Sequence, residues 1–235
     1  MEVLAGADLR SVSEQRAADV SVLVLDNHEL FSTVLMMALR ARGLNAHRAD
    51  LTRIEAVLRQ AEQLPSGLVL LDLNLGRDGL GRQVNGVHLV RALRARRWAV
   101  LVVSDHGDED RVAAAIAAGA AGVVAKSTSL RNLLLMVLAA SAGQPVMTES
   151  ERHAWLTRHR GYRARQHERA RRFERLSTRE REVLALMAQG RRATAIAEHF
   201  VVSLTTVRTQ IRAILVKLEV NSQLEAVALA ADDRC

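Results

Sequence analysis

Short apolar runs alternate with amphipathic segments along the first part of the chain. Five runs of five or six residues have the length of a strand, and they read SVLVLD, LNAHRA, GLVLLD, AVLVVS and GVVAK. Each is followed by a segment whose apolar residues recur every three to four positions, the period of a helix. We expect these helices at 28–43, 51–64, 86–96, 111–118 and 129–143. Five strands alternating with five helices predict an α/β fold with a doubly wound, five-stranded parallel sheet.

The segment from Leu176 to Ala231 shows only the helical period. Ser177 and Glu180 have the spacing of a capping box, and Ser222 and Glu225 repeat it before the last apolar segment. Between them we expect one helix over Ala193–Phe200 and another over LTTVRTQIRAILVKL, which is capped by Ser203. The sequence therefore predicts an all-α domain of four helices. The residues expected to face its core are Leu184, Leu186, Met187, Val207, Ile211, Ile214, Leu215 and Leu218.

Composition and charge divide the chain further. We expect a flexible N-terminal tail at 1–20, an α/β domain at 21–145, an arginine-rich helical linker at 146–174 and the all-α domain at 175–235. Residues 1–146 carry 16 basic against 15 acidic side chains, whereas the rest carries 17 against 11. The second part is thus the candidate polyanion binder.

Most of the basic excess lies between Arg152 and Arg181, a stretch with eleven arginines and three glutamates. An ordinary solvated linker helix is the favoured interpretation. The segment could instead dock on the α/β domain, pair with its copy in a dimer, or lie along a DNA backbone. Its heptad row is too short and too polar to predict a coiled coil; the row is Trp155, Tyr162, Arg169 and Leu176.

Several classes of protein are disfavoured by composition. The single cysteine, Cys235, excludes an internal disulfide framework and suggests a reducing compartment. No apolar run approaches the roughly 20 residues of a membrane span, and the first residues lack the features of a signal peptide. We expect a cytoplasmic protein without a membrane partner.

Polar residues follow four of the predicted strands. Asp26, Asp72, Ser104 and Lys126 stand at carboxyl ends, which meet at one edge of a parallel sheet. Two neighbouring carboxylates repel each other, so Mg²⁺ would be a natural partner. Asp72 could then attack a phosphoryl group whose oxygens Ser104 and Lys126 hold. Taken singly, each residue could equally cap a helix or be solvated.

The helix after Ser203 turns Thr205, Arg208, Thr209 and Arg212 outward within two turns. Such a row can enter a major groove, where arginine binds guanine or phosphate and threonine contacts phosphate or a thymine methyl. A solvated amphipathic helix is the alternative.

The strand-end set and the alternation from Ser21 to Gly143 resemble the receiver domain of two-component response regulators. The resemblance implies that Asp72 accepts a phosphoryl group from a histidine kinase. It further implies that Asp26, Asp72 and the backbone carbonyl of Asn74 hold Mg²⁺, while Ser104 and Lys126 sense the phosphate.

The sequences LSTREREVLALMAQG, AIAEHF and SLTTVRTQIRAILVKLEVNSQLEAVALA resemble the LuxR-type (NarL/FixJ-like) helix-turn-helix domain. This resemblance implies that double-stranded DNA meets Thr205, Thr206, Arg208, Thr209 and Arg212. It also implies a homodimer formed by the last helix through Leu224, Val227, Ala228 and Ala231.

The receiver part departs from the family pattern at four positions. Asn27 replaces the second acid, Gly76 and Ser127 replace prolines, and Val123 replaces the switch aromatic. We therefore predict a degenerate phosphoacceptor pocket that binds Mg²⁺ poorly. The loop GRDGLGRQVNG is longer than the family norm by about half a dozen residues, and such loops are mobile or functional.

Charged residues of this loop leave alternatives open. Asp78 could replace the missing carboxylate, although solvent-exposed turn chemistry is the favoured interpretation. Arg77 and Arg82 could instead pair with the acids.

The leading hypothesis is a dimeric, DNA-binding transcription regulator whose degenerate receiver acts independently of phosphorylation. The alternative is a conventional response regulator, phosphorylated on Asp72 by a histidine kinase with Mg²⁺. A phosphatase of the haloacid dehalogenase type is a remote third, because Asn74 stands where its second acid should be. A pure scaffold is disfavoured by the basic residues of the outward-facing row.

Overall fold

The computed structural model describes residues 20–105 and 107–232. The chain divides into two compact units, Met1–Arg160 and Gly161–Cys235. Apart from Val20, the tail expected at 1–20 lies outside the described residues. The division falls within helix α7 (Glu149–Glu174), which occupies most of the segment expected to be a linker.

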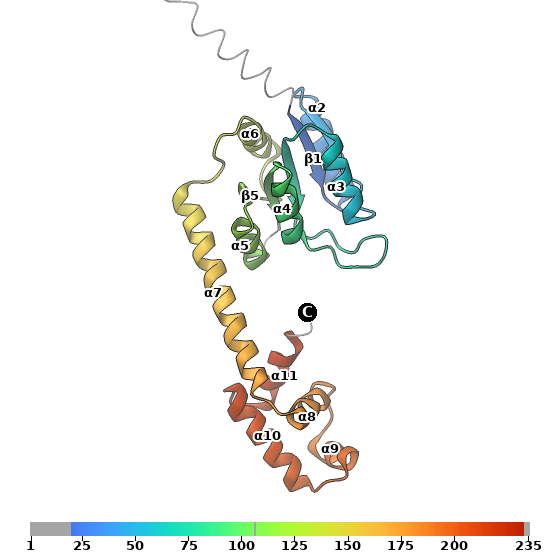
Figure 1. The fold of residues 1–235 in the computed structure, drawn as a ribbon, viewed down its shortest axis with the longest axis vertical. Helices are drawn as coiled ribbons and strands as arrows, with labels where there is room; N and C mark the ends of the chain where they lie inside the picture. Colours follow the sequence, from blue (N-terminus) through green and yellow to red (C-terminus); the bar gives the residue numbers. More distant parts are fainter. Residues whose placement is uncertain (1–19, 106, 233–235) are drawn as a thin grey trace, which may run out of the picture. The chain divides into compact units, whose positions relative to one another are not determined.

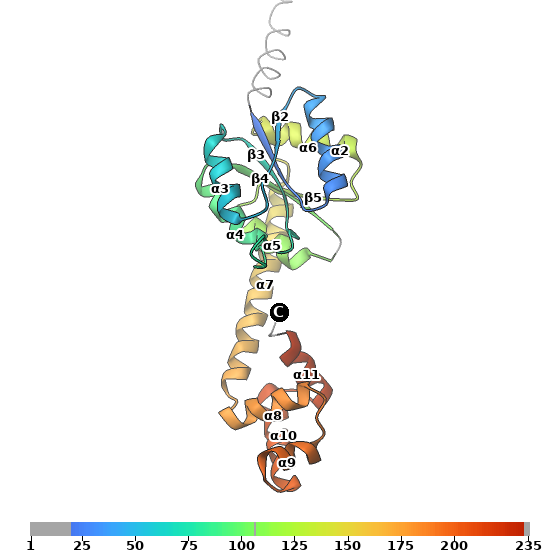
Figure 2. The same ribbon diagram turned by 90° about the vertical axis from the view of Figure 1, so that its right-hand side faces the viewer.

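The first unit contains a parallel sheet in the order β2-β1-β3-β4-β5 (Figures 1 and 2). This confirms the expected doubly wound sheet. The central strands β1 and β3 are buried along their whole length because helices cover both faces. The strands are Ser21–Leu25 (β1), Asn45–Arg48 (β2), Leu68–Asp72 (β3), Ala99–Ser104 (β4) and Gly122–Ala125 (β5).

Each face of the sheet has its own apolar core. Leu35 and Val137 belong to the core beneath α2 and α6, whereas Val57, Leu89 and Val112 belong to the core beneath α3, α4 and α5. The helices are Glu29–Arg40 (α2), Ile54–Gln63 (α3), Gly86–Ala95 (α4), Glu109–Ala117 (α5) and Leu130–Ser141 (α6). They match the expected segments, with ends shifted by a few residues.

Trp98 is the largest fully buried side chain of the first unit. Its indole nitrogen donates a hydrogen bond to the carbonyl oxygen of Ala61 at 3.0 Å. The one polar atom of this side chain is therefore satisfied inside an otherwise aliphatic core.

The second unit contains the helical domain and the end of α7. Its apolar core includes Val183, Ile196, Val207 and Ile214, and Leu186 and Leu215 are only half-buried at its edge. The helices are Thr178–Ala188 (α8), Ala193–Phe200 (α9), Leu204–Leu218 (α10) and Gln223–Asp232 (α11).

The expected helix caps are present with one difference. Ser177 and Glu180 form a complete capping box, and Ser203 accepts a hydrogen bond from the Thr206 amide at 3.1 Å. Ser222 accepts from the Glu225 amide at 3.1 Å, but the Glu225 carboxylate accepts from the Asn221 amide rather than closing the box on Ser222.

The first half of α7 docks on the first unit. Trp155 and Leu156 pack against the core beneath α3, α4 and α5. Arg152 donates to the carbonyl oxygens of Ala120 and Ala121, and Arg158 forms ion pairs with Glu109 and Asp110. The predicted linker thus docks on the α/β domain, an alternative that ranked below a solvated helix.

The second half of α7 docks on the second unit. Phe173 packs against its core, and Arg172 and Arg175 form ion pairs with Glu219 at the end of α10.

Among the helices that the structure describes, none combines the length and the apolar character needed to cross a bilayer.

Candidate strand-end site and nucleic-acid interface

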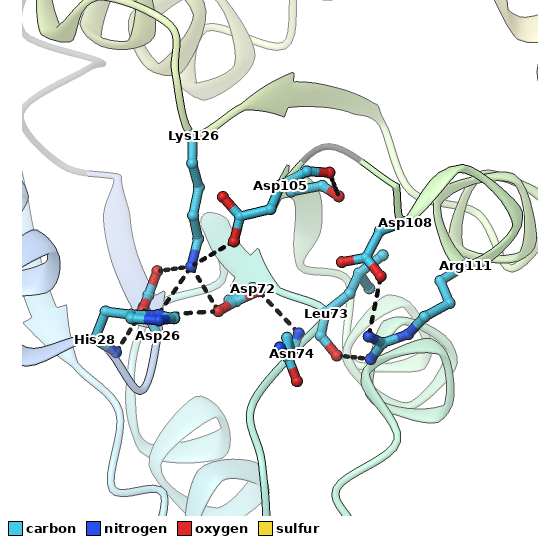
Figure 3. A network of polar contacts seen from close by, with 10 residues as sticks. Asp26, His28, Asp72, Leu73, Asn74, Asp105, Asp108, Arg111 and Lys126 are labelled. Atoms are coloured by element: carbon cyan, nitrogen blue, oxygen red, sulfur yellow. Dashed lines mark hydrogen bonds and ion pairs between the residues drawn. The ribbon is translucent and has the colours of Figure 1, made fainter. Parts of the chain in front are cut away.

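Three of the predicted strand-end residues meet at the carboxyl edge of the sheet. The Asp26 and Asp72 side chains are 2% and 1% exposed, and the Lys126 Nζ lies 3.2 Å from Asp26 Oδ2 and 2.7 Å from Asp72 Oδ2 (Figure 3). Because β1, β3 and β5 are parallel and the three residues end or directly follow them, the sheet itself brings these side chains together.

Lys126 neutralises part of the charge of the two carboxylates. Burial by itself would lower the pKa of this amine, but its hydrogen bond to Asp72 and the charges of Asp72 and Asp26 outweigh burial and raise the pKa above its ordinary value. The ammonium form therefore persists at any physiological pH.

His28 also belongs to the site, although the sequence reasoning did not select it. Its backbone amide donates to Asp26 Oδ1 at 2.7 Å, and this short turn folds the ring back over the site. Its Nδ1 lies 3.1 Å from Asp26 Oδ1, 3.6 Å from Asp72 Oδ2 and 3.0 Å from Lys126 Nζ. The available signal was an acid two positions before a histidine at the start of a helix.

The other strand-end residues take different positions. Ser104 is buried at the end of β4, but its hydroxyl donates to the Asp105 carbonyl oxygen at 3.2 Å. The Asn74 amide donates to Asp72 Oδ1 at 2.8 Å, so this turn fixes the Asp72 carboxylate. Asn27 is exposed.

The donor set suits a divalent cation in part. Asp26, His28 and Asp72 each offer a ligand atom, and these atoms lie within 4.8 Å of one another. Two carboxylates are the hard ligands that Mg²⁺ prefers, whereas an imidazole nitrogen is typical of transition metals. Any cation there would compete with Lys126 for both carboxylates.

The loop after β3 is built around Asp78. This carboxylate is only 9% exposed and accepts hydrogen bonds from the amides of Leu80 and Arg82. The expectation of turn chemistry is thus correct, but the expectation of solvent exposure is wrong. The loop is further held by the Gly79 amide, which donates to the Thr52 carbonyl oxygen at 2.8 Å.

Neither alternative for the loop charges is present. Within the described residues, the ionisable groups around Asp26 and Asp72 are His28, Lys126 and, at 3.9 Å from Lys126, Asp105. Asp78 serves its own loop, and Arg77 donates to the carbonyl oxygen of Gly81.

α10 presents the outward row expected from the sequence. Its buried face consists of Val207, Ile211, Ile214 and Leu218. The opposite side chains are exposed; they are Thr205, Thr206, Arg208, Thr209 and Arg212. The Thr206 hydroxyl shares a hydrogen bond with Ser203, and the Thr209 hydroxyl donates to the Thr205 carbonyl oxygen, whereas both arginines extend without a carboxylate within 4.0 Å in the described structure.

Side-chain contacts with α8 hold both α9 and α10 in place. Lys217 Nζ lies 2.6 Å from Glu180 Oε2, and the guanidinium of Arg179 lies 3.4 Å from the ring centre of Phe200 in α9. Burial would raise the pKa of Glu180, but hydrogen bonds from Lys217 and Ser177 outweigh burial and lower it. Glu180 is therefore ionised and joins the two helices.

The face of α11 expected to dimerise is only partly free. Leu224 is 79% exposed, and Ala228 and Ala231 are exposed as well. Val227 instead packs half-buried against the core of its own domain.

Comparison with known proteins identifies the family of this chain. The model described as "Response regulator receiver domain" matches residues 22–138, and the model described as "Bacterial regulatory proteins, luxR family" matches residues 174–230. The chain belongs to the LuxR-type response regulators. Members of this family are DNA-binding transcriptional regulators, and their receiver domains typically bind Mg²⁺.

Curated relatives align along nearly their whole length. LiaR, a transcriptional regulatory protein of Bacillus subtilis (strain 168), is 28% identical over 90% of this chain and 96% of its own. NarL, the nitrate/nitrite response regulator protein of Escherichia coli (strain K12), is 28% identical over 91% of this chain and 96% of its own. This LuxR-type response regulator thus has the two-domain organisation of these relatives.

Solved structures share a lower sequence identity with this chain than these curated relatives do. RcsB from Salmonella typhimurium gives a TM-score of 0.46 with 21% identity, covering 90% of this chain and 98% of that chain. Full-length FixJ from B. japonicum gives a TM-score of 0.43 with 23% identity, covering 90% of this chain and 96% of that chain.

Proposed function

We propose that this LuxR-type response regulator binds double-stranded DNA as a homodimer and reads a sequence through the exposed row of α10. The observation that carries this proposal is the division of α10 into two faces. One face is fixed in the core by Val207, Ile211 and Ile214, and the other leaves Arg208 and Arg212 free to meet an external partner.

The chemistry of this row fits a major groove. Arg208 and Arg212 can each bind a guanine edge through two hydrogen bonds or hold a phosphate. Thr205, Thr206 and Thr209 can donate to phosphates or contact thymine methyl groups. With DNA as its partner, we expect the protein to act in the cytoplasm.

The dimer would form through α11. Leu224 is a large apolar side chain left in solvent, and Ala228 and Ala231 beside it allow close approach of a second helix. Val227 would contribute only its outer edge because it also supports the core of its own domain.

We further propose that the receiver pocket is degenerate and that its signal is independent of phosphorylation. Asn27 offers no charge to a metal, and Lys126 already contacts both carboxylates. A partner protein or a ligand that binds the receiver would then supply the signal.

The conventional mechanism is the second candidate, and the meeting of Asp72 with Lys126 favours it. A histidine kinase would then phosphorylate Asp72, and Asp26, Asp72 and the Asn74 carbonyl would hold Mg²⁺. Ser104 would have to leave the Asp105 carbonyl oxygen to reach the phosphate. An aspartate-nucleophile phosphatase is not proposed, because the Asn74 carboxamide cannot act as a general acid or base and the family consists of transcriptional regulators.

The DNA proposal is tested with Arg208→Ala and Arg212→Ala. A duplex is first selected from a random pool by the wild-type protein, and its affinity is then measured by fluorescence anisotropy. Each variant should lose about 1–3 kcal/mol where the arginine reads a base. Arg131→Ala is the matched control, because Arg131 is an exposed arginine of α6 in the first unit.

Circular dichroism and thermal melting establish that both variants keep the fold. A double variant that binds the selected duplex as tightly as wild type would show that α10 is not the reading helix. A wild-type protein that enriches no duplex would defeat the proposal as a whole.

A further inference from the structure

The middle of α7 carries a row of basic side chains that the proposed function does not use. Arg160, Arg163, His167 and Arg171 follow one another at intervals of three and four residues, so they lie along one side of the helix. All four are exposed. We call this row the α7 basic stripe.

The arginines of the stripe have no acidic partners. Within the described parts of the chain, no carboxylate lies within 4.0 Å of Arg160, Arg163 or Arg171. Arg160 donates weakly to the Leu156 carbonyl oxygen at 3.4 Å, and Arg163 lies 3.5 Å from the His167 ring. Three charges of one sign are thus left to solvent.

Arginines elsewhere on α7 behave differently. Arg158 pairs with Glu109 and Asp110, while Arg172 pairs with Glu219, as does Arg175 directly after the helix. These residues dock the two halves of the helix. The stripe is therefore a separate surface, since it takes no part in docking.

The stripe does not stabilise the helix that carries it. Like charges three or four residues apart cost a few tenths of a kcal/mol per pair, and a glycine inside a helix, here Gly161, costs about 1 kcal/mol relative to alanine. A helix that served only as a spacer would gain from alternating charges. The stripe is better explained by an external polyanion.

The charge distribution favours DNA as that polyanion. Residues 182–235, which contain α9, α10 and α11, carry six basic and six acidic side chains and so offer no net attraction to phosphates. The stripe extends over about 17 Å at 1.5 Å per residue, a length that faces several phosphates of a duplex.

The second half of α7 is also close to the reading helix. Arg172 and Arg175 attach it to Glu219, the residue that follows α10. Arg172 also donates a hydrogen bond to the carbonyl oxygen of Leu218, the last residue of α10, at 3.4 Å. Arg163, His167 and Arg171 of the stripe thus belong to the same compact unit as α10.

We propose that the α7 basic stripe binds the phosphate backbone of the DNA that flanks the sequence read by α10. This inference rests on the proposed function, because α10 must bind the duplex before the stripe can contact the flanking backbone. Each arginine neutralises a phosphate and adds affinity that does not depend on base sequence.

The test uses the full chain with Arg160→Gln, Arg163→Gln and Arg171→Gln combined. The matched control combines Arg59→Gln, Arg91→Gln and Arg131→Gln, three exposed arginines of the first unit, which gives the same change in net charge. The affinities for the selected duplex and for a scrambled duplex are measured over a range of salt concentrations.

The stripe variant should weaken binding to both duplexes by the same factor. The slope of log K against log salt should decrease by roughly 0.9 for each phosphate that the protein no longer neutralises, about 2 to 3 in total. The control should keep the wild-type slope. The α10 variants Arg208→Ala and Arg212→Ala should instead reduce the preference for the selected duplex.

If the stripe variant has the same slope as the control, the inference is wrong, but the proposal that α10 reads DNA still stands. This result is expected if the stripe binds an acidic protein instead of DNA. A stripe variant that loses only the preference for the selected duplex overturns it too. No DNA binding by the wild type would defeat both proposals. Circular dichroism excludes unfolding as the cause of any loss.

Discussion

At the scale of single residues, the central feature is one ammonium shared by two buried carboxylates. Lys126 contacts both Asp26 and Asp72, and Asn27 adds no charge beside them. The site thus has one negative charge fewer to offer a metal than a site with three carboxylates. Lys126 already neutralises one of the two negative charges, which disfavours cation entry.

This balance predicts how the pocket responds to a phosphoryl analogue. Wild type in Mg²⁺ and beryllofluoride should show little thermal shift, because Lys126 competes with the metal for both acids. Asn27→Asp should produce a clear upward shift by supplying the missing acid. Asn27→Asp combined with Asp72→Ala is the control and should not respond. A wild-type shift as large as that of Asn27→Asp would favour phosphorylation on Asp72.

The sequence predicted some of these residues better than others. Asp26, Asp72 and Lys126 were predictable because a parallel sheet fixes where strands end. His28 was not, because its place depends on a turn in which the Asp26 side chain accepts from its backbone amide. The hydrogen-bond partner of the Ser104 hydroxyl was not predictable either, because the sequence does not show which acceptor near the end of the strand this hydroxyl binds.

At the scale of elements, α8 and α10 are joined by one ion pair. Glu180 completes the capping box of α8 and also binds Lys217 of α10. The capping box was visible in the sequence as a local spacing. The bond to Lys217 was not visible in the sequence, because Glu180 and Lys217 are 37 residues apart and meet only through the packing of the two helices.

We predict that Glu180→Gln destabilises the second unit by about 1–2 kcal/mol at neutral pH through loss of the ion pair to Lys217, because a glutamine can still accept the capping-box hydrogen bond from the Ser177 amide. The pKa of Glu180 is lowered from 4.5 in the folded state. Its stabilisation is therefore fully present above that ordinary value and is lost as the pH falls through the lower pKa of the folded state. Hydrogen exchange of α8 and α10 amides in the full chain, at neutral and at acidic pH, measures the effect.

Glu182→Gln is the control, because Glu182 pairs with Arg179 on the surface of the same helix and should change stability by at most about 0.5 kcal/mol. Equal exchange rates in Glu180→Gln and wild type would refute the prediction, as would a pH dependence that Glu180→Gln leaves unchanged.

Loops and connections were the least predictable elements. The loop after β3 was expected to expose Asp78, but the carboxylate is buried because it accepts from two amides of its own turn. Val201 ends α9 in the left-handed region at φ 54°, a conformation that a β-branched residue rarely adopts and that no sequence pattern indicated. The docking of α7 depended on Trp155, whose neighbours lie far away in the sequence.

At the scale of the whole molecule, the proposed dimer depends on a face of α11 that the protein leaves in solvent. Leu224→Asp should weaken self-association, because a charge replaces an apolar side chain that is 79% exposed in the single chain. Sedimentation equilibrium measures the association constant, and we expect a decrease of at least tenfold, or about 1.4 kcal/mol.

Val216→Asp is the matched control, because Val216 is 71% exposed on α10 and lies outside the proposed interface. The same association constant in Leu224→Asp and wild type would exclude this face of α11 as the interface. The doubly wound sheet and the four-helix domain were predictable at this scale because hydrophobic period and strand alternation indicate them, whereas the self-association surface was expected only from the family resemblance.

The docking of Trp155 has a practical consequence for spectroscopy. The chain contains two tryptophans, and Trp98 is held in the core by its hydrogen bond to Ala61. Trp98→Phe would leave one indole emitter, seated where α7 rests against the first unit. The emission wavelength and acrylamide quenching of that emitter would then report detachment of the helix in real time, in an otherwise unlabelled protein.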